Sequence, residues 1–235
     1  MKIFAISDLH LSINNPKPMD IFGPKWDNYV EILSENWQKN ISDDDLVLVS
    51  GDISWAMYLE DAVADLQFIR KLNGKIVFIR GNHDYWWKSI SAVRSKLPEN
   101  MYALQNDSLQ FDNIIICGTR GWTVPENETH KTPDDEKIYK RELIRLKLAL
   151  ENAKAKRKNN EKLICMLHYP PFNSKRQDSD FTKLLEEYNV NYVVYGHLHG
   201  NDCRAEIITE KNGITYHLTS CDLVENMPQE INIKE

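Results

Sequence analysis

The sequence contains few cysteines and no long apolar run. Its 235 residues include four cysteines, which lie far apart and form no Cys-x-x-Cys pair. This spacing argues against a disulfide framework or a thiolate zinc site, so we expect reduced, buried thiols. The longest apolar runs have the length of a strand, well short of the roughly 20 residues of a membrane span, and no signal-peptide pattern precedes them. We therefore expect a cytoplasmic protein that does not enter a membrane.

The sequence also has no excess of basic residues over acidic ones. The 29 Lys and Arg residues are outnumbered by 35 Asp and Glu residues, and the net charge is −6. A protein that grips a nucleic-acid polymer through its phosphates needs a basic surface, so such a partner is disfavoured, whereas a single nucleotide in a pocket is compatible. The basic run at residues 154–158 closes a predicted helix that begins with the acidic residues 134–136. The helix dipole favours this arrangement, which gives the run a structural explanation.

The chain lacks internal repeats and any linker rich in Gly, Pro or Ser. With 42% hydrophobic residues it can bury a full core, and its length does not require a second core. We predict one globular domain over residues 1–235. The sequence does not indicate an oligomeric state.

Short apolar runs alternate with longer amphipathic stretches. We expect strands at residues 2–7, 45–50, 75–79, 113–117, 163–167, 191–195, 204–209 and 214–218. We expect helices at residues 25–38, 59–72, 89–97, 134–158 and 180–188. The alternation predicts an α/β domain, and Asn212-Gly213 predicts a hairpin between the last two strands, so the sheet should be mixed. The long polar loops at residues 12–24 and 119–133 are expected to serve binding.

Residues that can bind a metal follow five of the predicted strands. They are Asp8 and His10, then Asp52, then Asn82 with His83, then His168, and finally His197 and His199. In α/β folds, ligands bind beyond the carboxyl ends of the strands, so these side chains should converge. Each motif alone is weak evidence, because Asp-x-His and His-x-His also arise by chance. Together they would crowd carboxylates and imidazoles into one crevice, which cations would neutralise.

The motifs Asp-x-His, Gly-Asp, Gly-Asn-His-Asp, His and Gly-His-x-His, in this order, resemble those of the calcineurin-like metallophosphoesterase superfamily. The match spans residues 8–199, and the segments GDISWAM, RGNHDYWW, HYPPFN and YGHLHG are similar to a bacterial subgroup of predicted phosphohydrolases. The resemblance implies two mixed β-sheets packed as a sandwich and flanked by helices, an α/β/β/α arrangement. It also implies a metal-dependent phosphoric ester hydrolase.

A dinuclear centre of transition-metal ions (Mn, Fe or Zn) follows from the same resemblance. It assigns Asp8, His10 and His199 to one ion, Asn82, His168 and His197 to the other, and Asp52 to a bridging position. Two such cations acidify a shared water and clamp the phosphoryl oxygens. The implied reaction is in-line attack of a metal-bridging hydroxide on a small phosphate monoester or diester, with nucleotides among the candidates.

His83 is the proposed catalytic histidine. Because Asn82 is the implied ligand, His83 is free to face the substrate, stabilise developing charge and protonate the leaving oxygen. Many family members place an Asp three residues after the Gly-Asp carboxylate to orient this histidine, and often an Arg next to bind phosphate. This chain has Trp55 and Ala56 there, which disfavours a phosphoprotein phosphatase. The candidates for the orienting partner are Asp84, Glu60 and Asp61.

Aromatic and basic residues flank these motifs. We expect Trp55 and Trp86 to line a pocket and stack on a flat group, and Arg120 and Arg80 to bind phosphate. Two other functions stay open at this point. A nuclease acting on a polymer would need a basic groove, and a non-catalytic scaffold on the same fold would lack metal ligands or His83.

Overall fold

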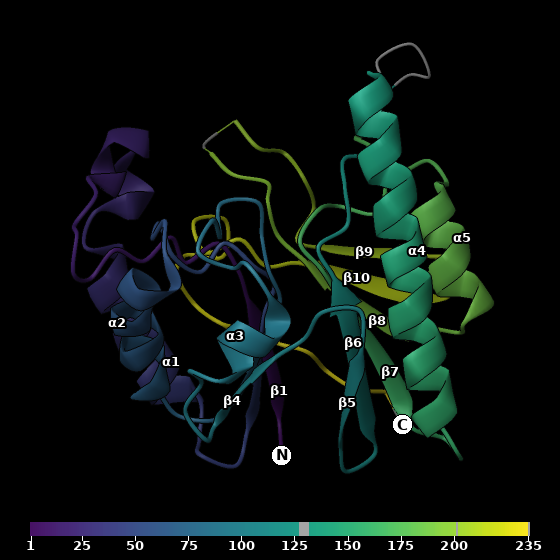
Figure 1. Cartoon of the computed structure of the whole chain (residues 1–235), viewed down its shortest axis with the longest axis horizontal. Coiled ribbons are helices and arrows are strands. Elements are labelled where there is room, and N and C mark those ends of the chain that lie inside the picture. Colours follow the sequence, from purple (N-terminus) through teal and green to yellow (C-terminus); the bar gives the residue numbers. More distant parts are fainter. Residues whose placement is uncertain (127–131, 201, 235) are drawn as a thin grey trace.

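Two β-sheets pack face to face with helices on their outer sides in the computed structural model, which describes residues 1–126, 132–200 and 202–234 (Figure 1). The first sheet has the order β11 (Gln229–Glu230), β1 (Ile3–Ile6), β2 (Leu46–Val49), β3 (Lys75–Phe78) and β4 (Met101–Ala103). The second has the order β5 (Ser108–Phe111), β6 (Ile114–Thr119), β7 (Lys162–Leu167), β8 (Tyr192–Tyr195), β10 (Ile214–Leu218) and β9 (Ile208–Lys211). Both sheets are mixed, because β11, β5 and β9 pair antiparallel with otherwise parallel strands. The predicted sandwich is confirmed.

Helices cover the outer face of each sheet (Figure 1). The first sheet carries α1 (Tyr29–Asn40), α2 (Leu59–Arg70) and α3 (Ile90–Arg94), and two short 3₁₀ turns, η1 (Met19–Phe22) and η2 (Pro24–Trp26), precede α1. The second sheet carries α4 (Pro133–Lys156) and α5 (Asp180–Glu187). Helix α4 has acidic residues in its first turn and basic residues in its last, as its sequence predicts. No helix in the described part of the chain is long and apolar enough to cross a membrane.

The central strands are apolar on both faces because both faces are covered. In β2, Leu46 and Leu48 pack between the sheets, whereas Val47 and Val49 pack under the helices. This double burial explains why the strands read as continuous apolar runs. Three of the four cysteines are buried and all four are free, as expected.

The predicted hairpin is present but shorter than expected. Ile214 pairs with Lys211, and the two turn residues Asn212 and Gly213 both have positive φ, as a tight antiparallel turn requires. The partner strand begins at Ile208, not at residue 204. One further hydrogen bond, from the amide of Leu218 to the carbonyl of Ile207, follows, and the next carbonyl, that of Thr219, accepts the amide of Ser7.

The carboxyl ends of the parallel strands meet where the two sheets adjoin. The amide of Asp8, after β1, donates to Gly51 after β2, and the amide of Gly196, after β8, donates to His168 after β7. A bridge between Ser7 and Ser220 connects the first sheet to the second. The loops that follow these strands are therefore held next to one another.

Candidate metal centre

The loops after five strands gather the expected ligands. Potential ligand atoms of Asp8, His10 and His199 lie within 4.8 Å of one another, and so do those of Asp8, Asp52 and His168. Asp8, Asp52 and His168 are buried, with side chains no more than 1% exposed. The arrangement brings donors from both sheets into one buried cluster.

Four of these residues have a left-handed backbone that is uncommon outside glycine. Asp8, His10, Asp52 and His197 have φ values of 61°, 44°, 51° and 73°. Such conformations cost about 1–3 kcal/mol each and persist only where the surroundings hold them. Here the amide of His10 donates to the carbonyl of Asp52 at 3.0 Å, and the amide of His197 donates to Asp8 Oδ2 at 3.0 Å. The strained turns aim the side chains at a common point.

Asp84 supports the loop that carries Asp52. Its buried carboxylate accepts hydrogen bonds from the amides of Gly81, Asp52, Ile53 and Ser54 and from the indole of Trp86, at 2.7–3.2 Å. Gly81 completes this packing, because a Cβ atom there would overlap the side chain of Asp52. Asp84 therefore fixes the backbone around the centre and is not directed at His83.

We expect Asp84→Ala to lower the free energy of unfolding by about 3 kcal/mol or more, because several buried N–H groups lose their acceptor at once. Denaturant unfolding of the metal-free protein would measure the change. Asp43→Ala, at an exposed position, is the matched control and should change stability by no more than about 0.5 kcal/mol. Equal stability of the two variants would contradict this role of Asp84.

Asn82, His168 and His197 form the second group of donors. His168 Nδ1 lies 2.9 Å from the carbonyl oxygen of Ser50, which requires the proton on Nδ1 and leaves a lone pair on Nε2. That Nε2 lies 2.6 Å from Asn82 Oδ1 and 3.5 Å from Asp52 Oδ2. His197 Nδ1 lies 2.9 Å from the same Asn82 oxygen. The lone pair of His168 Nε2 thus faces the Asn82 oxygen, an arrangement that a cation between them would stabilise.

Asp222 is a site residue that the sequence analysis missed. Its Oδ1 lies 2.9 Å from His199 Nδ1, its Oδ2 accepts the amide of Gly200 at 2.9 Å, and His199 Nε2 lies 3.2 Å from Asp8 Oδ1. A carboxylate on the far nitrogen of a histidine is the usual way to orient a metal ligand. The sequence could have indicated Asp222, because it follows strand β10 in the same way as the other candidate residues follow their strands.

The pKa values fit a site prepared for cations. Burial lowers the pKa of His10 and His168 to about 3 and that of His197 to about 4, which keeps these imidazoles neutral. Burial also acts on His199, but hydrogen bonds to Asp222 and Asp8 outweigh it and raise the pKa to about 10. Burial and the nearby charge of Asp8 raise the pKa of Asp52 to about 9. Two carboxylates this close are stabilised together only by added positive charge.

The donor set itself agrees with a transition-metal centre. Its atoms are imidazole nitrogens, carboxylate oxygens and one amide oxygen, which suit Mn, Fe or Zn. The Nδ1 atom of His10 is buried and has no hydrogen-bond partner within the described ranges. The residues present therefore fit the implied ions.

His83 lies beside this cluster with its ring among aromatic neighbours. Its amide donates to Asp52 Oδ1 at 2.7 Å, and its ring centre lies 4.7 Å from Trp55 and 5.5 Å from His10. Its Nδ1 has no hydrogen-bond partner in the part of the chain that the structure describes. Of the three candidate orienting partners, Asp84 is engaged elsewhere, and Glu60 and Asp61 are exposed in the first turn of α2. In the part of the chain that the structure describes, the ring of His83 therefore packs against Trp55 and His10 and has no carboxylate partner.

Only some of the residues that were expected to contact the substrate lie next to the cluster. Trp55 stacks on His10, with ring centres 4.8 Å apart. Trp86 is fully buried with its indole on Asp84, so the expectation that it contacts substrate is corrected: it belongs to the core. The guanidinium of Arg120 lies over the ring of Trp122 and 3.5 Å from the carboxylate of Glu142. The backbone carbonyl of Arg120 accepts a hydrogen bond from the amide of His168. Arg80, between β3 and Gly81, is half-buried.

Comparison with known proteins gives a family match over most of the chain. The family model described as calcineurin-like phosphoesterase matches residues 1–201. A protein of Coxiella burnetii described as a probable cyclic nucleotide phosphodiesterase is 26% identical over 211 residues, which cover 86% of this chain and 77% of that protein. An uncharacterized protein of Methanocaldococcus jannaschii is 32% identical over 123 residues, 50% of this chain and 68% of its own.

Solved structures share the fold at low sequence identity. The phosphopantetheinyl hydrolase of Mycobacterium tuberculosis aligns with a TM-score of 0.57 at 13% identity and covers 99% of this chain and 96% of its own. A protein of unknown function from Aquifex aeolicus aligns with a TM-score of 0.51 at 15% identity, over 97% of this chain and 95% of its own. At these identities the likeness concerns the fold alone.

Proposed function

The chain belongs to the calcineurin-like phosphoesterase family, a family of metal-dependent enzymes, and from this premise we propose that it hydrolyses a small phosphate ester at a centre of two transition-metal ions. The observation that carries the proposal is the convergence of carboxylate, imidazole and amide donors from both sheets on one buried cluster. The relative described as a probable cyclic nucleotide phosphodiesterase supports a small phosphate ester as substrate.

Two groups of residues would hold the ions. Asp8, His10 and His199 would bind one, Asn82, His168 and His197 the other, and Asp52 would serve both. The position of Asp52 supports this sharing, because its Oδ2 lies 3.9 Å from His10 Nε2 and 3.5 Å from His168 Nε2. When bound, such a pair of ions supplies an acidified water and positive charge for the phosphoryl oxygens.

The protein's own side chains supply the remaining steps. His83 would give a proton to the departing oxygen, and its partly exposed position beside His10 suits contact with the substrate. Asp222 would hold the ring of His199, and the carbonyl of Ser50 would hold that of His168. Trp55 would limit the movement of His83.

We expect the metal-free protein to hydrolyse no phosphate ester and activity to return with Mn, because imidazole donors suit ions softer than Mg. The measurement is turnover of a panel of nitrophenyl phosphate monoesters and diesters after chelation and again after addition of each metal. Full activity with Mg alone, after removal of all other metals, would contradict the proposed centre. Inactivity with every metal and every ester would overturn the proposed function.

A further inference from the structure

A pocket opens beside the candidate metal centre on the side of the second sheet. It has a volume of about 450 Å³, within the range of small-molecule sites. Its apolar walls are formed by Val124, Tyr169, Phe172, Leu198 and Ala205. We call it the side pocket.

The side pocket is continuous with the centre through residues adjacent in sequence to the ligands. His197 is itself part of the lining, Leu198 lies between His197 and His199, and Tyr169 follows His168. The ring centre of Tyr169 lies 4.1 Å from that of His197. A group attached to a phosphate at the centre would therefore enter this pocket directly.

Three of the four charged side chains of the lining, and several polar ones, are engaged by neighbouring side chains. Arg176 pairs with Glu206 at 2.8 Å, and Ser174 donates to Glu126 at 2.6 Å. The side-chain amide of Asn173 donates to Gln177 at 2.7 Å. The fourth charged side chain, Arg204, is exposed to solvent, so the enclosed part of the pocket is formed by the apolar walls, which favour an uncharged occupant over a second phosphate.

His83 lies on the side of the centre that carries His10. Its ring neighbours are His10, Trp55 and Tyr85, none of which lines the side pocket, whereas the pocket includes His197. A leaving group protonated by His83 would thus depart away from the pocket. The organic group in the pocket would be the one that stays on phosphorus.

Resting on the proposed function, we propose that the substrate is a phosphodiester whose retained group, an uncharged apolar or aromatic one, binds in the side pocket. Water would supply a hydroxyl to phosphorus, the bond from phosphorus to the other ester oxygen would break, and that oxygen would leave as an alcohol with the proton from His83. The product is a monoester that still carries the retained group.

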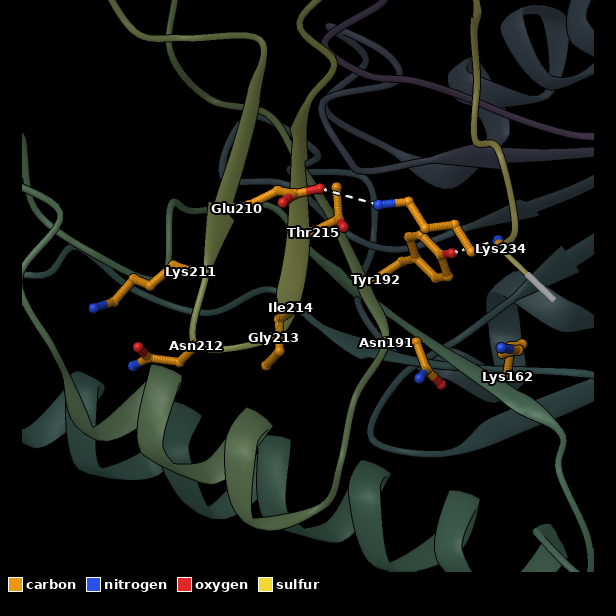
Figure 2. A pocket seen from close by; sticks show the side chains of 10 residues that line it. All are labelled: Lys162, Asn191, Tyr192, Glu210, Lys211, Asn212, Gly213, Ile214, Thr215 and Lys234. Carbon is orange, nitrogen blue, oxygen red and sulfur yellow. Dashed lines mark hydrogen bonds and ion pairs between the residues drawn. The ribbon is translucent and has the colours of Figure 1, made fainter.

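A second pocket is not a candidate for binding the retained group. It has a volume of about 520 Å³ and lies at the β9–β10 hairpin, near the amino ends of β7, β8 and β10 (Figure 2). None of the candidate ligands lines it. Figure 2 shows Glu210 paired with Lys234, and the amide of Lys234 donates to the hydroxyl of Tyr192. Its position is remote from the strand ends that bear the centre.

The test compares diesters that share one leaving group. We expect the metal-loaded protein to hydrolyse nitrophenyl phenyl phosphate with a kcat/KM about tenfold higher than methyl nitrophenyl phosphate, because the phenyl ring is buried in the pocket. A carboxyphenyl group in place of phenyl should lose this advantage. Equal kcat/KM for phenyl and methyl diesters would overturn the proposal.

Filling the pocket provides the second measurement. Ala205→Phe, and independently Thr123→Phe on the exposed part of the lining, should lower the phenyl-to-methyl ratio of kcat/KM toward one. Ala155→Phe, the same change at an exposed position on α4, should keep the wild-type ratio. An unchanged ratio in both folded pocket variants would overturn the proposal while leaving the phosphoesterase function intact. Hydrolysis of nitrophenyl monoesters but of neither diester would overturn the proposal and keep the proposed function, whereas inactivity on every ester would remove that function as well.

Discussion

Replacing His83 with alanine is expected to lower turnover of alkyl phosphate esters by about 10²–10⁴-fold, the usual contribution of a general acid. An alkoxide is a poor leaving group and needs the proton, whereas a nitrophenolate departs without it. Nitrophenyl esters should therefore lose much less activity. The measurement is kcat on one ester of each kind, with metal content determined for the same samples.

Metal content separates the alternatives for His83. In the proposed centre His83 is not a ligand, so the alanine variant should bind both ions. His83→Gln is the matched variant, because glutamine can donate a hydrogen bond but cannot act as an acid at neutral pH. Equal losses on both esters with rescue by glutamine would point to orientation or charge stabilisation, and lost metal would make His83 a structural residue.

Asp52→Asn is expected to weaken metal binding at both positions, by at least the roughly 10–100-fold that a change next to a metal ligand costs, and to abolish turnover. The reason is the shared position of Asp52 between His10 and His168. Asp8→Asn should mainly empty one position. Elemental analysis of the purified variants at defined metal concentrations measures both losses.

The fold of the metal-free Asp52→Asn variant should survive. Asparagine has the shape of a protonated aspartate, and the pKa of Asp52 is raised to about 9 in the metal-free protein. Asp43→Asn, at an exposed position, controls for a general effect of losing one carboxylate. A wild-type protein that shows full activity with one ion per chain would contradict a bridging role.

The strand ends were predictable because sequence periodicity and chemistry agree there. Each central strand is buried on both faces, so it reads as an apolar run that stops abruptly at Asp8, Asp52 or His168. The short strands β4, β5 and β11 escaped prediction because edge strands of two to four residues carry too few apolar positions to show a period.

Contacts between side chains distant in sequence were not predictable. Asp222 reaches His199 only because β10 lies beside β8, and Asp84 reaches the Asp52 loop only because β3 lies beside β2. Trp86 follows a motif of candidate ligands and was therefore expected to line a pocket, yet its indole donates a hydrogen bond to Asp84 inside the core. Burial of this kind depends on how the loops fold over the sheets, which local patterns do not encode.

The bridge between Ser7 and Ser220 has a consequence for the order of events during folding. It is one of several contacts between the sheets that join residues far apart in the sequence. Another is the hydrogen bond from the amide of His197 to Asp8, which is 189 residues away along the chain. Contacts of such high sequence separation form late, because a long loop must close first. A nascent chain that has emerged only as far as β4 holds Asp8, His10, Asp52 and Asn82 but none of the histidines from the second sheet. We therefore expect the complete set of candidate ligands to assemble only when the two sheets dock.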